Sequence, residues 1–139
     1  PSAAPSRSVQ QAEVSQGPVF VPVSLGELFD KVSILKLKSE LLQGQAQMHA
    51  IQELQALSTV LEGLQLSIDP SLVERLTEIN RELWALEEEI RSLEKLLSFG
   101  ERFVLVARAI YFKNDQRAVL KRTINTCYGS ALIEQKSYW

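Results

Sequence analysis

Cysteine and histidine are nearly absent from this chain of 139 residues, in which Cys127 is the one cysteine and His49 the one histidine. A single thiol cannot form a disulfide within the chain. One cysteine and one histidine are also too few ligands for a structural zinc site. We therefore expect no metal, no cofactor and a reducing compartment, the cytoplasm. An organelle reached by means of a transit peptide is the alternative, because Ser, Ala and Arg occur near the beginning while acidic residues are scarce there.

A basic excess and a long apolar run are missing too. The chain has 15 basic and 17 acidic residues and a net charge of −2, whereas dedicated nucleic-acid binders are usually basic. A bilayer-spanning helix needs about 18 apolar residues, and the longest candidate run, 103–112, is interrupted by Arg108. We expect no nucleic-acid partner and no membrane span.

Groups suited to catalysis are scarce as well. His49 lies in a glutamine-rich stretch without a serine or cysteine relay near it. Cys127 falls on an apolar seam, where a buried small apolar residue is expected. Consecutive carboxylates at 87–89 point about 100° apart on a helix and cannot converge on one ion. The sequence therefore predicts a protein that is not an enzyme.

What the chain does contain is enough apolar material for a core, since 45% of its residues are hydrophobic. Residues 1–18 are small and polar with three prolines, which predicts a flexible arm. Residues 19–139 then form a single helical-bundle domain. Within it, 19–23 (VFVPV) suits an edge strand or an extended lead-in, and a short terminal β pairing with 130–139 is possible if helices support it.

Local signals predict the first helices. Ser24 to Glu27 has the form of a capping box, from which a helix runs to about Gln43 with Gly44 as a left-handed stop. Apolar residues spaced for a helix continue from Met48 to Leu64. We expect two helices before the middle of the chain.

The strongest pattern is a heptad seam in a third helix that begins at Asp69-Pro70 and extends to about residue 97. Ser98 to Glu101 repeats the earlier capping pattern, so a fourth helix spans about 100–127. The short connection makes the two helices an antiparallel αα-hairpin. The fold class is all-α, an antiparallel helical bundle. The seam consists of Leu72, Leu76, Ile79, Leu83, Leu86, Ile90, Leu93 and Leu97.

Two cations interrupt the seam of the fourth helix. A turn centred on Phe99 places Lys113 near Leu86 and Arg117 near Glu82. Counter-charges are then within reach of both cations, at Glu82, Glu87, Glu88 and Glu89. One interpretation is that Lys113 and Arg117 lay their methylene stems over the seam and pair with these carboxylates at its margin, which fixes the helix register. The other is an anion or ligand pocket on a polar arc of about 80°, formed by Asn114, Arg117, Lys121 and Asn125.

The first helix is apolar on two sides and therefore needs two partners. One stripe consists of Leu28, Val32, Leu35 and Leu42, and the second of Ile34, Leu37 and Leu41. The helix lies either in the middle of the bundle or against another chain. Asp30 points with the second stripe and Lys31 lies between the two, so at least one of them is expected to have a salt partner.

Three segments together resemble a family of short, uncharacterised helical proteins of bacteria and their phages. They are GELFDKVSIL at 26–35, NDQRAVLKRTIN at 114–125 and KSY at 136–138. The resemblance implies an all-helical fold and no established activity. By position it also marks a set of polar residues: Glu27, Asp30, Lys31, Asn114, Asp115, Arg117, Lys121, Asn125, Lys136 and Tyr138.

Three functions are compatible with these features. The first is a non-enzymatic scaffold or accessory module that binds other protein chains, or a second copy of itself, through helical faces. The alternative is a small anion- or ligand-binding regulatory domain that uses the polar arc of the last helix. A further alternative is a permanent subunit of a large organellar or phage assembly.

Overall fold

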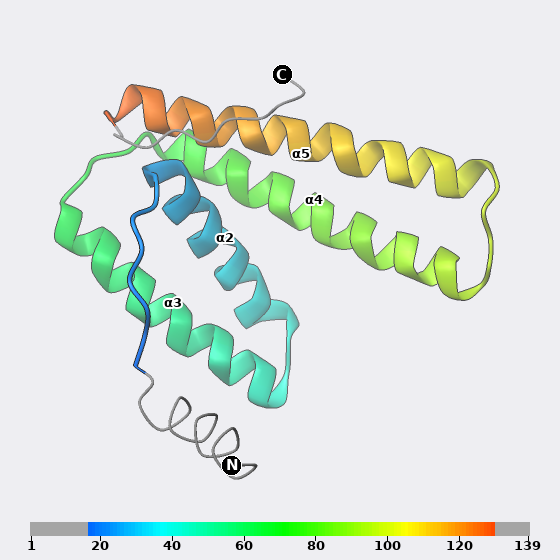
Figure 1. The fold of residues 1–139 in the computed structure, drawn as a ribbon, viewed down its shortest axis with the longest axis horizontal. Coiled ribbons are helices and arrows are strands. Elements are labelled where there is room, and N and C mark those ends of the chain that lie inside the picture. The colour runs from blue at the N-terminus through cyan, green and yellow to red at the C-terminus, as the bar shows by residue number, and fades with distance from the viewer. Residues whose placement is uncertain (1–16, 130–139) are drawn as a thin grey trace, which may run out of the picture.

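The computed structural model describes residues 17–129 and contains four helices within them. In chain order these are α2 (Leu25–Leu41), α3 (Gly44–Leu64), α4 (Pro70–Lys95) and α5 (Glu101–Cys127). The all-α prediction is confirmed (Figure 1). Residues 17–24 contain no strand. Most of the predicted arm and the 130–139 half of the β pairing lie outside the described residues.

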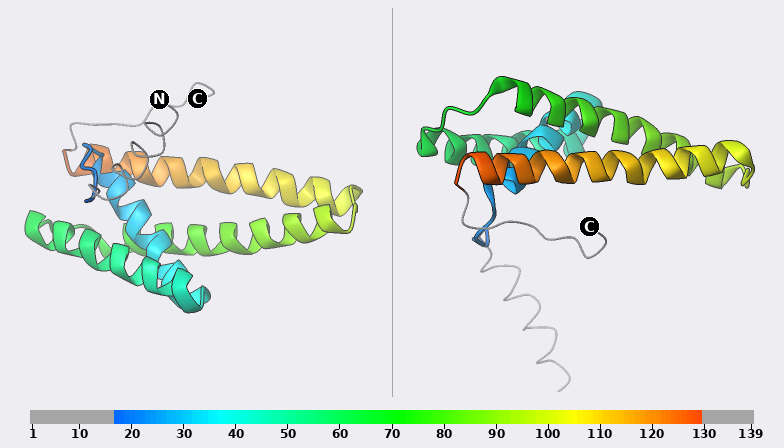
Figure 2. Two further views of the ribbon diagram at one scale, coloured as in Figure 1. Left: turned by 60° about the horizontal axis from the view of Figure 1, so that its bottom comes forward. Right: turned by 90° about the horizontal axis from the view of Figure 1, so that it is seen from above.

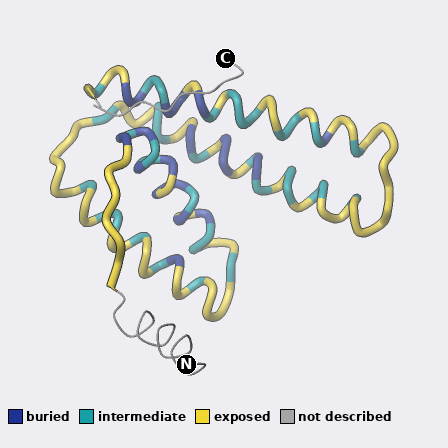
Figure 3. The backbone as a smooth tube through the Cα atoms, viewed as in Figure 1, coloured by how far each residue is buried: buried dark blue, intermediate teal, exposed yellow. Residues whose placement is uncertain are grey.

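The α4–α5 hairpin is the longest unit of the fold, and its two helices run antiparallel side by side (Figure 1). Its apolar cluster combines Leu76, Ile79 and Leu83 of α4 with Leu120 and Ile124 of α5. These residues lie in the half of the hairpin that α2 also covers. Toward the turn the buried positions become sparse, because only two helices pack there (Figure 3). The predicted hairpin is confirmed.

Helix α2 is the central element of the bundle. It contacts α3, α4 and α5, whereas α3 contacts α2 alone among the described helices (Figure 2). Leu28, Val32, Leu35 and Leu37 are all buried. The prediction that the first helix needs two partners is correct: the partners are α3 and the α4–α5 hairpin, and both belong to the same chain. The α2–α3 pair leaves the α4–α5 hairpin at an angle (Figure 1).

The helix starts follow local hydrogen-bonding rules. The Ser24 hydroxyl accepts from the amide of Glu27 at 3.1 Å. Asp69 accepts from the amide of Ser71 at 3.0 Å and is followed by a proline at the first helical position. Side-chain oxygens thus satisfy amides that have no partner within the helix. Within residues 17–129, no helix is both long and apolar enough to cross a bilayer.

Two expected details of the helix ends are wrong, and a third differs by two residues. The cap of α5 is Gly100, which makes no side-chain hydrogen bond, so Ser98 does not repeat the earlier cap. Helix α4 ends at Lys95, because Leu97 adopts a left-handed conformation with φ 53° that a helix cannot contain. Cys127 is exposed as the last residue of α5, where helical packing ends. The heptad pattern therefore extends further in sequence than the packed seam does in space.

Candidate functional site

A cluster of polar side chains lies where α2 crosses α4 and α5, and we call it the polar crossing. Helix α2 contributes Asp30 and Ser33, α4 contributes Asn80, and α5 contributes Arg117 and Lys121. The exposed fraction is 3% for Asp30 and 4% for Asn80. Buried carboxylates and amides require hydrogen-bond or ion-pair partners, because removing them from water without such partners costs free energy.

Asn80 is the centre of the hydrogen-bond network in the polar crossing. Its Nδ2 donates to Asp30 Oδ1 at 2.9 Å and lies 2.7 Å from Ser33 Oγ, while the Ser33 hydroxyl donates to the backbone oxygen of Asp30 at 2.8 Å. Its Oδ1 accepts from Arg117 Nη1 at 3.3 Å. Arg117 Nε also lies 3.8 Å from Asp30 Oδ1. The network therefore links three helices through neutral and charged partners.

Lys121 and Asn125 connect the beginning of α2 to α5. Lys121 Nζ lies 2.7 Å from Glu27 Oε2 and 3.9 Å from Asp30 Oδ2. Asn125 is buried, and its Oδ1 accepts from the backbone amide of Gly26 at 2.7 Å. A Cβ at position 26 would come within 2.3 Å of the backbone oxygen of Lys121. Glycine at position 26 thus permits an approach of the two helices that any side chain would prevent.

The charged pairs of the hairpin differ from the predicted register. Lys113 forms an ion pair with Glu82, one of the predicted counter-charges, which lies one helical turn before the predicted neighbour Leu86. Arg117 meets Asn80 and Asp30 rather than Glu82. The physical reason is the turn: because α4 ends at Lys95 and α5 begins at Glu101, the connection is centred closer to position 98 than to Phe99.

The structure brings four of the seven sequence-selected residues together: Asp30, Arg117, Lys121 and Asn125. Lys31 instead pairs with Glu53 of α3 at 3.1 Å, with both side chains about half exposed. Asn114 and Asp115 are half-buried, and no hydrogen bond or ion pair is found for them within the described residues.

Sequence reasoning missed Ser33 and Asn80. In the sequence, each of them is a polar residue that directly follows an apolar helix position: Ser33 follows Val32, and Asn80 follows Ile79. That pattern is common on ordinary amphipathic helices, so it does not by itself identify a buried network.

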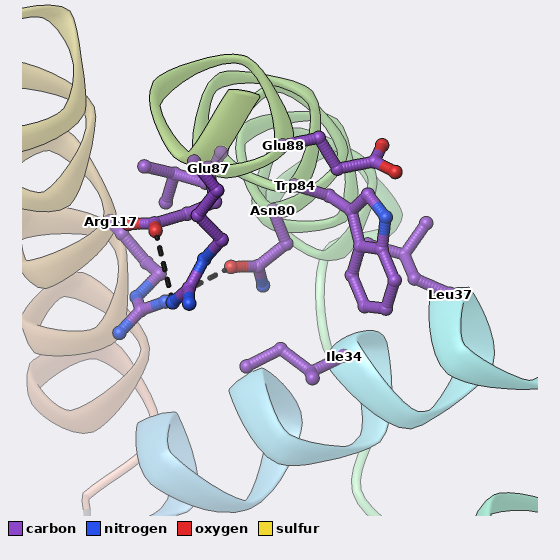
Figure 4. A pocket seen from close by; sticks show the side chains of 9 residues that line it. Ile34, Leu37, Asn80, Trp84, Glu87, Glu88 and Arg117 are labelled. Carbon is purple, nitrogen blue, oxygen red and sulfur yellow. Dashed lines mark hydrogen bonds and ion pairs between the residues drawn. The ribbon is translucent and has the colours of Figure 1, made fainter. Parts of the chain in front are cut away.

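A pocket of about 390 Å³ lies beside the polar crossing and is lined mainly by residues of α2 and α4. Figure 4 shows Arg117 on one side, Trp84 on the other, Asn80 between them and Ile34 rising from α2. Glu87, Glu88 and Arg91 of α4, together with Leu37 and Leu83, complete its lining. The pocket is large enough for a small organic molecule.

A second surface, which we call the outer stripe, follows α5 on the side opposite its seam with α4. Between 49% and 56% of each of its apolar residues is exposed. Arg108 lies over the Phe112 ring, with 5.7 Å between its Cζ and the ring centroid, and Tyr111 stacks on Phe112. The sequence pattern that could have revealed the stripe is a helix apolar on two sides. The outer stripe consists of Val104, Leu105, Tyr111, Phe112 and Val119.

Metal-ligating residues do not converge in the described part of the chain: no group of three His, Cys, Asp or Glu side chains is placed to hold an ion. The groups that the polar crossing and the pocket present are guanidinium, amide, carboxylate and apolar side chains.

Comparison with known proteins gives one finding. No curated protein and no solved structure matches the chain. A family model described as a family of unknown function (DUF6165) matches residues 19–139, which include the whole bundle. The expectation of an uncharacterised family is thereby confirmed, and the chain belongs to this family of unknown function.

Proposed function

We propose that this chain is a scaffold module that acts by binding protein rather than by catalysis. Its partner at the outer stripe of α5 is a second copy of the chain, packed antiparallel. The observation that carries the proposal is the outer stripe itself, an apolar face on a helix whose other apolar face is already covered by α4.

The outer stripe has the character of an interface rather than of ordinary surface. Its apolar side chains recur with heptad spacing, so that Val104 and Tyr111 follow one line and Leu105, Phe112 and Val119 another. The stretch from 104 to 119 is about 22 Å long on a helix. A helix that is apolar on two sides requires two partners, and contiguous apolar patches of this kind mark interaction sites.

The pattern of the outer stripe is complementary to itself. A two-fold axis between Tyr111 and Phe112 places Val104 opposite Val119 of the second copy. The same register places Arg108 opposite Asp115, a carboxylate without a hydrogen bond or ion pair within the described residues. A two-fold interface repeats each contact, so both charge pairs form together. An antiparallel homodimer therefore satisfies the apolar and the charged positions at once.

Charge reversal tests this register. Arg108→Asp places two carboxylates opposite each other, and Asp115→Arg places two guanidiniums opposite each other. Each single variant is expected to weaken the dimer at least about tenfold, since opposed like charges oppose association. The double variant restores both pairs, and an equimolar mixture of the two single variants forms a heterodimer. Molar mass by light scattering over a concentration series measures all four cases.

Arg75→Asp provides the matched control, because Arg75 is exposed on α4 and away from the outer stripe. It makes the same change of charge and is expected to leave the dimer intact. A full chain that is monomeric at about 100 µM, well above the dissociation constants of specific dimers, contradicts the proposal. If a chain ending at Gly129 dimerises while the full chain does not, the occupant of the outer stripe is the segment 130–139 of the same chain rather than a second copy.

The family's occurrence in bacteria and phages and the cytoplasmic location stay predictions from the sequence. A permanent place in a larger assembly is compatible with a paired scaffold, but no particular contact in the described residues favours it.

A further inference from the structure

The pocket between α2 and α4 is distinct from the outer stripe, because its α5 residue, Arg117, lies on the seam side of that helix. We propose that this pocket binds a small organic monocarboxylate whose body is apolar and planar, such as an aryl-substituted short-chain acid. The proposal is independent of self-association.

The floor of the pocket selects an apolar body. Ile34 and Leu37 of α2 line the pocket together with Leu83 and Trp84 of α4. Figure 4 shows the indole of Trp84 beside Leu37, with Ile34 on the α2 side of the pocket. Leu37 and Leu83 are buried, while Ile34 and Trp84 are partly accessible. The indole offers a flat face on which an aromatic ring can stack. A volume of about 390 Å³ accommodates a ring and a short chain.

Arg117 supplies a fixed anion-binding group at the inner end. One of its N–H groups donates to Asn80, and its Nε faces Asp30 at 3.8 Å. A guanidinium has five N–H donors, so most of the donors of Arg117 are left for a ligand or water. Because Asn80 and Asp30 are buried and hydrogen-bonded to each other, they hold this guanidinium in place before a ligand arrives. Planar guanidinium groups bind carboxylates through two parallel hydrogen bonds.

A second guanidinium, that of Arg91, lies on the rim. Its Nη2 lies 3.5 Å from Glu87 Oε2, and three quarters of its side chain is exposed, so it can turn toward a ligand at small cost. Two arginines therefore line the same pocket as the apolar floor.

The overall charge of the lining favours a monoanion over a dianion. The two arginines are balanced by Glu87 and Glu88, so the four charged side chains sum to zero. A phosphate or sulfate dianion would face two carboxylates and would place nothing against the apolar floor. A carboxylate with an apolar body places its single charge at Arg117 and buries its body against the apolar floor. Such a ligand therefore uses both the guanidinium and the apolar side chains of the pocket.

Binding of 3-phenylpropionate to the full chain tests the proposal. We expect a saturable shift of the indole N–H resonance of Trp84 in ¹⁵N-labelled protein, with a dissociation constant near or below about 1 mM for a ligand of this size. The resonance is assigned by comparison with Trp84→Phe, because Trp139 also carries an indole. The neutral amide of the same acid has the same body without the charge, and it should bind at least about tenfold more weakly.

Two exposed arginines on α4 give a matched pair of variants. Arg91→Gln removes the rim guanidinium and should weaken the acid about tenfold while leaving the amide unchanged. Arg81→Gln removes an arginine that pairs with Glu40 outside the pocket, and it should change neither. Neither variant alters the buried network, so both should fold.

The contrary results are definite. The proposal is overturned if the acid and the amide bind with equal affinity. It is also overturned if Arg91→Gln and Arg81→Gln lose the same amount of affinity for the acid, or if the Trp84 resonance does not shift at about 10 mM acid.

Discussion

Replacing Gly26 by alanine should force α2 away from α5 and destabilise the whole bundle. The Cβ of an alanine would lie 2.3 Å from the backbone oxygen of Lys121 and 2.9 Å from its carbonyl carbon. Both opposing atoms belong to the backbone of a long helix, so neither can rotate away. The helices must separate by about 1 Å to reach an ordinary van der Waals contact.

That displacement also disrupts the hydrogen bond between the Gly26 amide and Asn125, which is 2.7 Å long and buried. A separation of about 1 Å takes it beyond hydrogen-bonding distance. Overpacking costs about 1–3 kcal/mol, and a buried polar group left without a partner costs about 1–3 kcal/mol. The higher helix propensity of alanine relative to glycine offsets at most about 1 kcal/mol of this loss of stability. We expect a net loss of about 2–4 kcal/mol in the free energy of unfolding, or a Tm lower by about 8–16 °C.

Urea denaturation followed by circular dichroism at constant protein concentration measures this loss. Gly63→Ala is the matched control, because Gly63 lies in α3 with nothing within 4 Å of the added Cβ. It should leave stability unchanged or raise it by up to about 1 kcal/mol. If Gly26→Ala is as stable as the natural chain, the close approach of α2 and α5 does not contribute as we infer.

Two further predictions concern charged side chains. Asp30→Ala should lower the free energy of unfolding by about 3–5 kcal/mol, because it leaves buried partners uncompensated. In contrast, Glu53→Ala, which removes the half-exposed partner of Lys31, should change the free energy of unfolding by less than about 1 kcal/mol. If urea denaturation gives similar losses for Asp30→Ala and Glu53→Ala, the buried and the exposed carboxylate do not differ as we infer. Hydrogen bonds from Arg102 lower the pKa of Glu89, so this pair should stabilise the fold above the pKa of an unfolded glutamate, about 4.3, and lose that effect as pH falls through the lowered folded value. The stability difference between the natural chain and Glu89→Gln should therefore be present at about pH 7 and vanish at about pH 2, and a constant difference would contradict it.

Much of the fold was predictable because it depends on neighbours in the sequence. The capping residues Ser24 and Asp69 act on amides two or three residues away, and the heptad seam repeats along one helix. The hairpin follows from two such helices joined by a short turn. Its register was predicted less well, because the left-handed conformation of Leu97 ends α4 early and moves the centre of the turn.

The sequence by itself determined the helical class, the order of the helices, the starts at the first and third helices, and the need of α2 for two partners. Only the tertiary structure decided which polar groups meet. Asn80 and Asp30 are 50 positions apart, and Gly26 and Asn125 are 99 apart. Such pairs depend on the crossing of helices, which is set by packing along their whole length rather than by any local pattern. For the same reason, the pocket beside Arg117 exists only once α2 has docked against the hairpin.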